Sequence, residues 1–150
     1  LALANTRARI RMTTLYYIAQ SNNTIVLGTG NKIEDFGIGF FTKYGDGGVD
    51  ISPIADLLKS EVYSIAKELK IRDDILNAPP TDGLWEENKT DEDQIGASYP
   101  ELEWAMNFKQ TNQVLSERER EVLKIYKRLN TINQHKMKKI PICNIPKKMR

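Results

Sequence analysis

The chain has 150 residues, of which 40% are hydrophobic and 28% charged, a composition typical of one compact, soluble globular domain. A net charge of only +2 provides no global field for binding nucleic acid, and no apolar run approaches the length of a membrane span. Cys143 is the only cysteine, which excludes an internal disulfide and favours a reducing, cytoplasmic compartment.

The first half of the chain is predicted to alternate between helix and strand. Apolar residues at helical spacing predict an amphipathic helix over residues 4–20. The β-branched run TIVLG, residues 24–28, predicts a buried strand of a parallel sheet, and a turn then leads into a short helix around residues 33–37. This order indicates an α/β domain, to which the chain contributes one convincing strand.

The second half is predicted to be helical and rich in loops. Ser52 as N-cap and Pro53 at the first helical position predict a helix that runs to about residue 70. One face of this helix should be buried through the apolar residues Val62, Ile65, Ala66 and Leu69. Prolines and a glycine predict a loop over residues 77–84, which the acidic stretch 86–93 should continue.

Two more helices complete the predicted order. Residues 99–108 have helical spacing, and a capping box at Ser116 and Glu119 opens the last helix. The apolar face of this last helix carries Val122, Tyr126 and Leu129. Prolines beyond it predict an extended tail.

Residues 40–50, FFTKYGDGGVD, carry the densest group of candidate functional side chains. Their three glycines allow positive φ angles and close approach to a ligand. Lys43 suits a phosphate or a developing negative charge, and Asp46 and Asp50 can accept hydrogen bonds or help to hold a metal ion. A strand end followed by a glycine turn with surface charges explains the same pattern, and spacing alone gives the two interpretations equal weight.

Other candidates are more isolated. The turn GTGNKIED, residues 28–35, offers backbone amides and a helix N-terminus to an anion, and Glu34 within it is either a ligand for a hard metal ion or a partner of the helix dipole. His135 is the only histidine, which leaves no basis for a histidine zinc site or a catalytic triad.

Three arginines, Arg7, Arg9 and Arg11, share the first predicted helix. Arg7 and Arg11 fall on one side of it, and Arg9 is turned away by about 200° of helix rotation. They therefore cannot all bind the same ligand.

Six stretches of the chain resemble NAD synthetases in order and approximate spacing, from near residue 2 to near residue 141. They are ANTRARIRM, VLGTGNKIED, GFFTKYGDGGVDISPIADLLKSEV, PPTDGL, TDEDQIGASY and NQHKMKKIP. GFFTKYGDGG is the most specific of them. The resemblance implies a homodimeric α/β enzyme with a Rossmann-like parallel sheet flanked by helices, of the adenine nucleotide alpha hydrolase-like type, here a partial domain with a helical C-terminal half.

The activity that the resemblance implies is ATP-dependent amidation of deamido-NAD to NAD. ATP and Mg²⁺ would adenylate the nicotinate carboxylate, and ammonia would then displace AMP, with pyrophosphate as the other product. By resemblance, the contacts to deamido-NAD are Arg9, Tyr16, Lys43, Asp50, His135 and Lys136. The contacts to ATP are Thr29, Lys59 and Thr81, the magnesium ligand is Glu34, and the catalytic residues are Lys43 and Asp46.

One feature of the family is absent from the chain. The ATP pyrophosphatase loop, an SGGxDS-type stretch, precedes this region in the family and cradles pyrophosphate through backbone amides. We therefore expect residues 1–150 to be the C-terminal portion of a synthetase domain, inactive alone or dependent on the missing half. The source of nitrogen stays open between free ammonia and a separate glutaminase domain.

Two alternatives remain beside NAD synthetase. One is another ATP-activating, amide-forming enzyme of the same superfamily, such as GMP synthetase, although the FFTKYGDGG loop and the His135–Lys136 pair argue against it. The other is a non-catalytic fragment that only dimerises or binds nucleotide.

Overall fold

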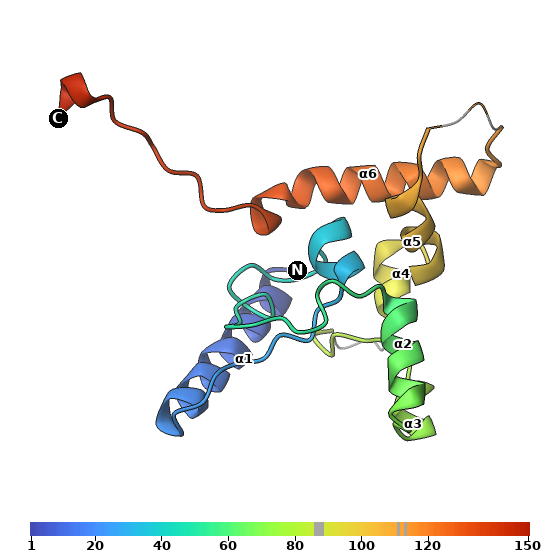
Figure 1. Ribbon diagram of the computed structural model, residues 1–150, viewed down its shortest axis with the longest axis horizontal. Coiled ribbons are helices and arrows are strands. Elements are labelled where there is room, and N and C mark those ends of the chain that lie inside the picture. The colour runs from blue at the N-terminus through green and yellow to red at the C-terminus, as the bar shows by residue number, and fades with distance from the viewer. Residues whose placement is uncertain (86–88, 111, 113) are drawn as a thin grey trace.

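The computed structural model describes residues 1–85, 89–110, 112 and 114–150 (Figure 1). The longer helices are α1 (Ala2–Ser21), α2 (Lys59–Glu68), α5 (Tyr99–Asn107) and α6 (Glu117–Met137). The shorter helical segments are the π-helical turn η1 (Ile33–Ile38), α3 (Asp73–Leu76), α4 (Asp91–Ile95) and the 3₁₀ turn η2 (Lys147–Met149). In Figure 1, α6 lies across α5 and η1, whereas α1, the α2–α3 pair and the C-terminal tail extend outwards.

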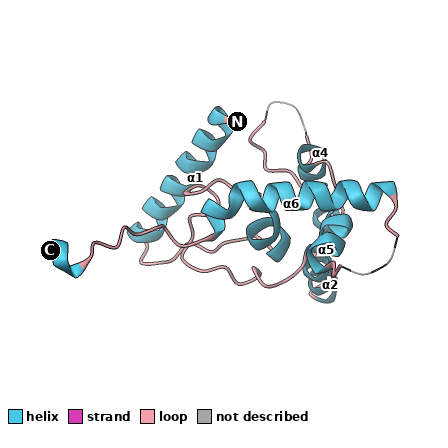
Figure 2. Ribbon diagram, turned by 90° about the horizontal axis from the view of Figure 1, so that it is seen from above, coloured by secondary structure: helices cyan, strands magenta, loops and turns pink. Residues whose placement is uncertain are grey.

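The main hydrophobic core lies where η1, α5 and α6 meet. Ile33 and Ile38 of η1, Leu102 of α5 and Val122 of α6 belong to one buried cluster, and each is at most 1% exposed. Figure 2 shows α6 crossing above α5 and α2. Burial of one such aliphatic side chain is worth about 1.5–3 kcal/mol. This core therefore fixes η1 against α6, the two elements that carry Glu34 and the His135–Lys136 pair.

Local sequence signals account for α6. The Ser116 hydroxyl accepts a hydrogen bond from the Glu119 amide at 3.2 Å, and the Glu119 carboxylate accepts one from the Ser116 amide at 2.7 Å. The predicted capping box is therefore confirmed. Val122 is buried, and Tyr126 and Leu129 pack against the same core, as their spacing predicts.

The predicted buried strand over residues 24–28 is wrong for the part of the chain that the structure describes. Val26 is buried, but Ile25 and Leu27 are each 58% exposed. A single parallel bridge pairs Leu27 with Ile51, and it is the only β-pairing among the described residues. A buried parallel strand needs neighbours on both edges and helices on both faces, and these residues supply one short neighbour.

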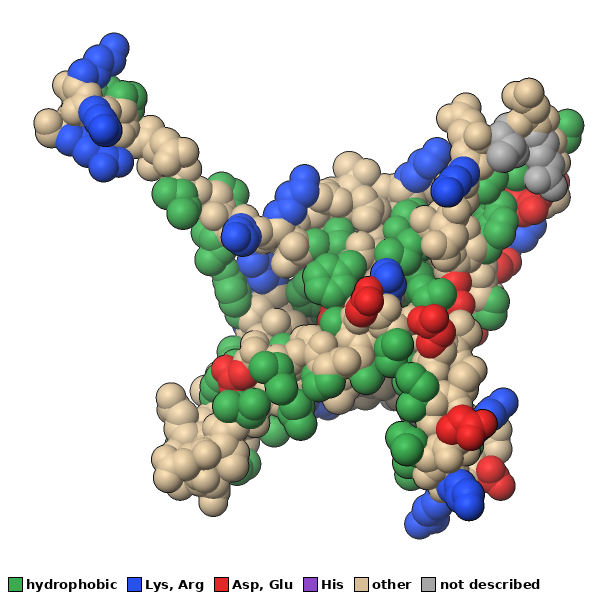
Figure 3. Space-filling model, in the orientation of Figure 1, with side chains coloured by type: hydrophobic (Ala, Val, Ile, Leu, Met, Phe, Trp, Pro, Cys, Tyr) green, Lys and Arg blue, Asp and Glu red, His purple; other side chains and the backbone are tan. Residues whose placement is uncertain are grey.

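The helix predicted from Ser52 begins later. Residues 53–56 form turns, and α2 starts at Lys59, where the Glu61 carboxylate accepts a hydrogen bond from the Leu58 amide at 2.7 Å. The prediction of a buried face is also wrong: no residue of α2 is buried, although the whole helix is described. Figure 3 shows hydrophobic side chains on the surface along α2 and beside α1. Their helical spacing is real, but the described residues cover them only in part, and Ile65 and Leu69 are 44% and 69% exposed.

The acidic stretch 86–93 is only partly a loop. Residues 86–88 lie outside the described residues. From Asp91 onward the chain forms α4, capped by the Thr90 hydroxyl, which accepts a hydrogen bond from the Asp93 amide at 3.1 Å. Carboxylates in a first helical turn interact favourably with the helix dipole, which is why this acidic run is helical.

The glycines of residues 40–50 serve a different purpose from the one predicted. Within the described chain, the positive φ angle of this loop belongs to Tyr44, at 61°, and not to Gly45, Gly47 or Gly48. A Cβ atom at Gly47 would collide with the ring of Phe41. The glycines are thus needed because the loop folds tightly onto itself and onto α1, rather than for left-handed backbone angles.

We expect Gly47→Ala to destabilise the protein by about 1–2 kcal/mol, because the added methyl group must displace the Phe41 ring. Urea unfolding measures this change. Gly37→Ala is the matched control, since its added Cβ would meet its nearest neighbour, Tyr126, at 3.5 Å, an ordinary contact. Equal losses in the two variants would contradict the proposed clash.

An ion pair joins α5 to α6. Arg118 donates from Nε and Nη2 to the two carboxylate oxygens of Glu101 at 2.7 and 2.8 Å. Hydrogen bonds from Arg118 and then from Ser98 lower the pKa of Glu101 to about 2 from 4.5, against a smaller opposing effect of burial. Because the folded-state pKa is depressed, this stability is present above pH 4.5 and is lost as the pH falls toward 2.

We therefore expect Glu101→Gln to lower the free energy of unfolding by about 1 kcal/mol at pH 7, a value reduced for the solvent exposure of the pair. The difference between parent and variant should vanish near pH 2. Urea unfolding at several pH values tests this, and a difference that stays constant with pH would exclude the ion pair as its cause.

Candidate active site

The three arginines of α1 contact two different segments. Arg7 and Arg11 reach the segment of residues 82–84, where Arg11 donates to the carbonyls of Asp82 at 3.0 Å and Gly83 at 2.9 Å. Arg7 donates to the carbonyl of Leu84 at 2.7 Å. Helical geometry had predicted that these two share a side, and that prediction is confirmed.

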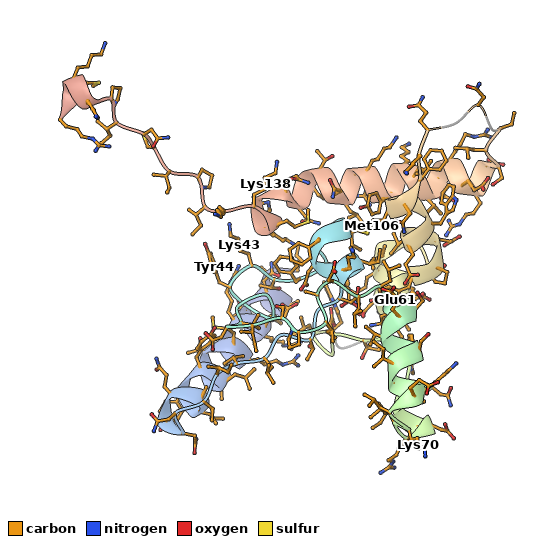
Figure 4. The ribbon with its side chains drawn as sticks, in the orientation of Figure 1. Lys43, Tyr44, Glu61, Lys70, Met106 and Lys138 are labelled. Carbon is orange, nitrogen blue, oxygen red and sulfur yellow. The ribbon has the colours of Figure 1, made fainter. Side chains whose placement is uncertain are left out.

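Arg9 points to the glycine loop instead. Its Nε and Nη2 atoms both donate to the carbonyl oxygen of Lys43 at 3.3 Å. The Lys43 ammonium in turn donates to the carbonyl of His135 at the end of α6, at 2.6 Å. Figure 4 shows Lys43 and Tyr44 on the side of the loop that lies below Lys138 and the end of α6.

Lys136 ties the same loop to α6 more tightly. Its ammonium donates to the carbonyls of Gly39 at 2.8 Å and Phe41 at 2.7 Å, and it lies 5.5 Å from the centre of the Phe41 ring. Burial lowers the pKa of Lys136, and the charge of Asp46 opposes that shift. The structure thus brings Arg9, Lys43 and the His135–Lys136 pair together from segments over 90 residues apart.

Tyr16 and Asp50 form a second pair at this end of the molecule. The Tyr16 hydroxyl donates to Asp50 Oδ1 at 3.1 Å, and Asp50 Oδ2 accepts from the Val26 amide at 2.8 Å. Desolvation and the Asp50 carboxylate raise the pKa of Tyr16. A tyrosine hydroxyl already carries its proton at neutral pH, so Tyr16 is the donor of this pair.

Asp46 borders two cavities. One, of about 140 Å³, also meets Lys136, and the other, of about 260 Å³, also meets Thr29. Asp46 Oδ1 accepts from the Thr42 amide at 2.9 Å, which fixes its carboxylate in the loop. Although Asp46 reaches solvent, desolvation by the surrounding protein raises its pKa, against the lowering effect of backbone hydrogen bonds and Lys136.

Glu34 occupies a separate cluster with Lys59. Glu34 Oε1 accepts from the Lys59 ammonium at 3.1 Å and from the Tyr99 hydroxyl at 2.5 Å, and Oε2 accepts from the Asn31 amide at 3.3 Å. The side chains of Glu34 and Lys59 are only 15% and 20% exposed. The structure therefore brings these two predicted residues together and adds Tyr99, which the sequence had indicated only as part of a helix.

Carboxylates gather around this cluster. The Tyr99 hydroxyl also lies 3.3 Å from Oδ2 of Asp91, which is 8% exposed. Asp35 lies next to Glu34 in sequence, and burial followed by the charges of Glu34 and Asp46 raises its pKa to about 6. The Lys59 ammonium lies within the resulting negative potential.

Thr29 and Thr81 are both exposed. Thr29 lines the larger cavity with Asp46. Thr81 lies between Pro80, whose carbonyl accepts from the Asp91 amide at 3.0 Å, and Asp82, whose carbonyl Arg11 holds. Among the described residues, neither threonine hydrogen-bonds to Glu34 or Lys59, so the predicted ATP contacts do not form one connected group here.

The donor set at Glu34 fits one kind of magnesium site. No group of three or more His, Cys, Asp or Glu side chains within the described residues could hold a metal ion by itself. Mg²⁺, however, is commonly held by one or two carboxylates together with substrate phosphates and water. Glu34 can supply one such carboxylate.

Comparison with known proteins identifies the family. A family model described as NAD synthase matches residues 1–141. The chain belongs to this family. The NH(3)-dependent NAD(+) synthetase of Carboxydothermus hydrogenoformans is 43% identical over 141 residues, which make up 94% of this chain and 54% of that protein. The NAD synthase match opposes the GMP synthetase alternative and agrees with the resemblance drawn from the FFTKYGDGG loop.

Solved structures of NAD synthase relatives have the same fold. An NMN synthetase from Francisella tularensis matches with a TM-score of 0.83 and 37% identity, over 95% of this chain and 56% of that one. The NH3-dependent NAD synthetase of Campylobacter jejuni in complex with nitrate matches with a TM-score of 0.70 and 28% identity, over the same shares. The chain thus spans about half the length of the relatives that it matches.

Within the described residues, no helix is both long and apolar enough to cross a membrane.

Proposed function

We propose that this chain forms the deamido-NAD side and part of the ATP side of an ammonia-dependent NAD synthetase. The observation that supports this most directly is the convergence of Arg9, Lys43 and Lys136 on one loop, whose Asp46 borders both cavities. Family membership supplies the reaction, and this geometry gathers Arg9, Lys43 and the His135–Lys136 pair at one loop.

The proposed chemistry activates a carboxylate for amide formation. A carboxylate oxygen is a poor leaving group. When this oxygen attacks the α-phosphate of ATP, pyrophosphate leaves and the oxygen becomes part of an acyl-adenylate. Ammonia can then displace AMP to form the amide. The steps require two nucleotides held in line and positive charge at phosphorus. Lys59 can supply such a charge beside Glu34, and Mg²⁺ held by Glu34 and the phosphates would add to it.

The remaining residues are proposed to position deamido-NAD and ammonia. Lys43 and the His135–Lys136 pair lie at the loop where the dinucleotide would bind, with Arg9 behind them. Asp46 can accept a hydrogen bond from ammonium, and together with Asp35 it creates a local negative potential that favours this cation. Free ammonia is therefore the proposed nitrogen donor. Tyr16 and Asp50 are proposed to contact deamido-NAD, and Thr29 and Thr81 to contact ATP.

We further propose that residues 1–150 are the C-terminal portion of a synthetase domain with a Rossmann-like parallel sheet. The Leu27–Ile51 bridge has the parallel sense that such a sheet requires. The exposed apolar side chains of α1 and α2 offer surface that the rest of the domain, or a second subunit of a homodimer, would cover. A cytoplasmic location fits the single, unpaired cysteine.

A second candidate substrate is nicotinate mononucleotide. The solved structure that matches with the TM-score of 0.83 is described as an NMN synthetase. Amidation of nicotinate mononucleotide is the same reaction on a smaller substrate, so the residues around the nicotinate carboxylate would act identically.

The test is a direct assay of both substrates. The chain, alone and joined to the N-terminal segment of the Carboxydothermus relative, is incubated with ATP, Mg²⁺ and ammonium plus deamido-NAD, nicotinate mononucleotide or, as a control, xanthosine monophosphate. Chromatography then measures NAD, NMN and AMP. We expect the joined protein to form NAD and the chain alone to form little. If the joined protein binds ATP but amidates xanthosine monophosphate instead, the proposal fails, and no amidation of any substrate favours the non-catalytic fragment.

A further inference from the structure

Tyr99 begins α5 beside the two residues assigned to magnesium and ATP. Its hydroxyl donates to Glu34 Oε1 at 2.5 Å and lies 3.3 Å from Asp91 Oδ2. The side chain is 5% exposed and belongs to the main core. A buried phenol that faces two carboxylates is an unusual feature, since a leucine or phenylalanine would fill the core without a polar group to satisfy.

The single phenolic proton is shared unequally. A tyrosine hydroxyl has one donor proton, and the shorter distance assigns it to Glu34. Asp91 stands on the other side, and its Oδ1 atom is buried without a hydrogen-bond partner among the described residues. The backbone amide of Asp91 is fixed by the carbonyl of Pro80 at 3.0 Å. If the hydroxyl proton turns away from Glu34, the other acceptor near it is the Asp91 carboxylate.

The ring of Tyr99 acts on Lys59 at the same time. The Lys59 ammonium lies 4.7 Å from the ring centre and 3.1 Å from Glu34 Oε1. A cation above an aromatic face is attracted by the ring quadrupole. One side chain thus orients both members of the Glu34–Lys59 pair, through its hydroxyl and its face respectively.

The position of Tyr99 itself is fixed independently of that pair. Its amide donates to the Glu92 carboxylate at 2.8 Å, and the first turn of α5, which contains Tyr99, is capped by Glu101, which accepts from the Ser98 amide at 2.8 Å. The tyrosine is therefore a rigid support, and Glu34 is the partner that depends on it.

We propose that Tyr99 is a positioning residue of the reaction: it aims the Glu34 carboxylate at magnesium–ATP and keeps Lys59 beside it. This inference rests on the proposed function. Tyr99 acts through Glu34 and Lys59 and does not touch the substrate itself.

The test is Tyr99→Phe, which keeps the ring over Lys59 and removes the hydroxyl. In the joined protein we expect kcat and the affinity for Mn²⁺ in the presence of ATP to fall roughly ten-fold or more, as for loss of a hydrogen bond to a charged group. The KM for deamido-NAD should change less than two-fold. Electron paramagnetic resonance of Mn²⁺ gives the metal affinity without any turnover.

Tyr126→Phe is the matched control, because Tyr126 is a partly buried tyrosine of α6 that packs against the same core. We expect it to leave kcat and Mn²⁺ affinity near the parent values. Urea unfolding should show that both variants stay folded, with the larger loss of stability in Tyr99→Phe, which removes the hydrogen bond to Glu34. Equal kinetic losses in the two variants, or unchanged Mn²⁺ affinity in Tyr99→Phe, would overturn the positioning role. If the parent forms no NAD, the proposed function fails, and the Mn²⁺ titration still decides the role of Tyr99. A parent that binds no Mn²⁺ with ATP also overturns it.

Discussion

Replacing Lys43 by alanine is expected to lower kcat/KM for deamido-NAD by about 100-fold, the loss typical of one positioned charge in an active site. Lys43 presents its ammonium beside the proposed dinucleotide site and contacts the protein through the His135 carbonyl at 2.6 Å. That contact is exposed, so the free energy of unfolding should fall by less than about 1 kcal/mol. Steady-state kinetics of the joined protein measure kcat/KM, and urea unfolding of the parent and the Lys43→Ala variant measures the free energy of unfolding.

Lys124→Ala is the control for Lys43→Ala, since Lys124 is an exposed lysine on α6, away from the glycine loop. It should change neither kcat/KM for deamido-NAD nor the free energy of unfolding. Parallel losses of activity and stability in Lys43→Ala would favour the simple surface turn that the sequence pattern of residues 40–50 also fits.

Replacing Lys136 by methionine is expected to destabilise the protein by about 2–3 kcal/mol. Methionine nearly preserves the volume of the side chain, but the carbonyls of Gly39 and Phe41 would lose the charged donor that they share. Activity should fall as well, because these carbonyls hold the loop that carries Lys43 and Asp46. Urea unfolding and the amidation assay measure both losses.

Lys138→Met tests whether the effect is specific to Lys136. Lys138 is exposed just beyond α6, as Figure 4 shows, so its replacement should change stability by less than about 0.5 kcal/mol. If the two variants unfold at the same urea concentration, Lys136 does not anchor the loop.

Features set by neighbouring residues could be predicted from the sequence. The spacing of Ser116 and Glu119 located the start of α6, and the helical angle between Arg7, Arg9 and Arg11 separated their contacts. Such signals depend on three or four consecutive residues, whose geometry in a helix is fixed before any tertiary contact forms.

Features set by distant or missing neighbours could not be predicted. The apolar pattern of residues 24–28 and of α2 is consistent with burial, but burial depends on what packs against it, and Leu27 and Leu69 stay exposed here. The sequence indicated Tyr99 only as part of a helix, and its contact to Glu34 spans 65 residues of sequence. The glycines of the loop could not reveal that Tyr44 would take the positive φ angle, since that choice follows from packing against α1.

The hydrogen bonds from Arg7 and Arg11 to residues 82–84 affect which substitutions this segment tolerates. Both guanidinium groups hold main-chain oxygens, which every amino acid possesses. These two contacts beside Thr81 therefore do not depend on which side chains residues 82–84 carry. Other constraints do: Gly83 has a φ of 59°, which restricts substitution there, and Leu84 is buried in a cluster with Ala4 and Ala8. A substitution that respects Gly83 and Leu84 therefore leaves both arginine contacts intact, and with them the position of the adjoining threonine.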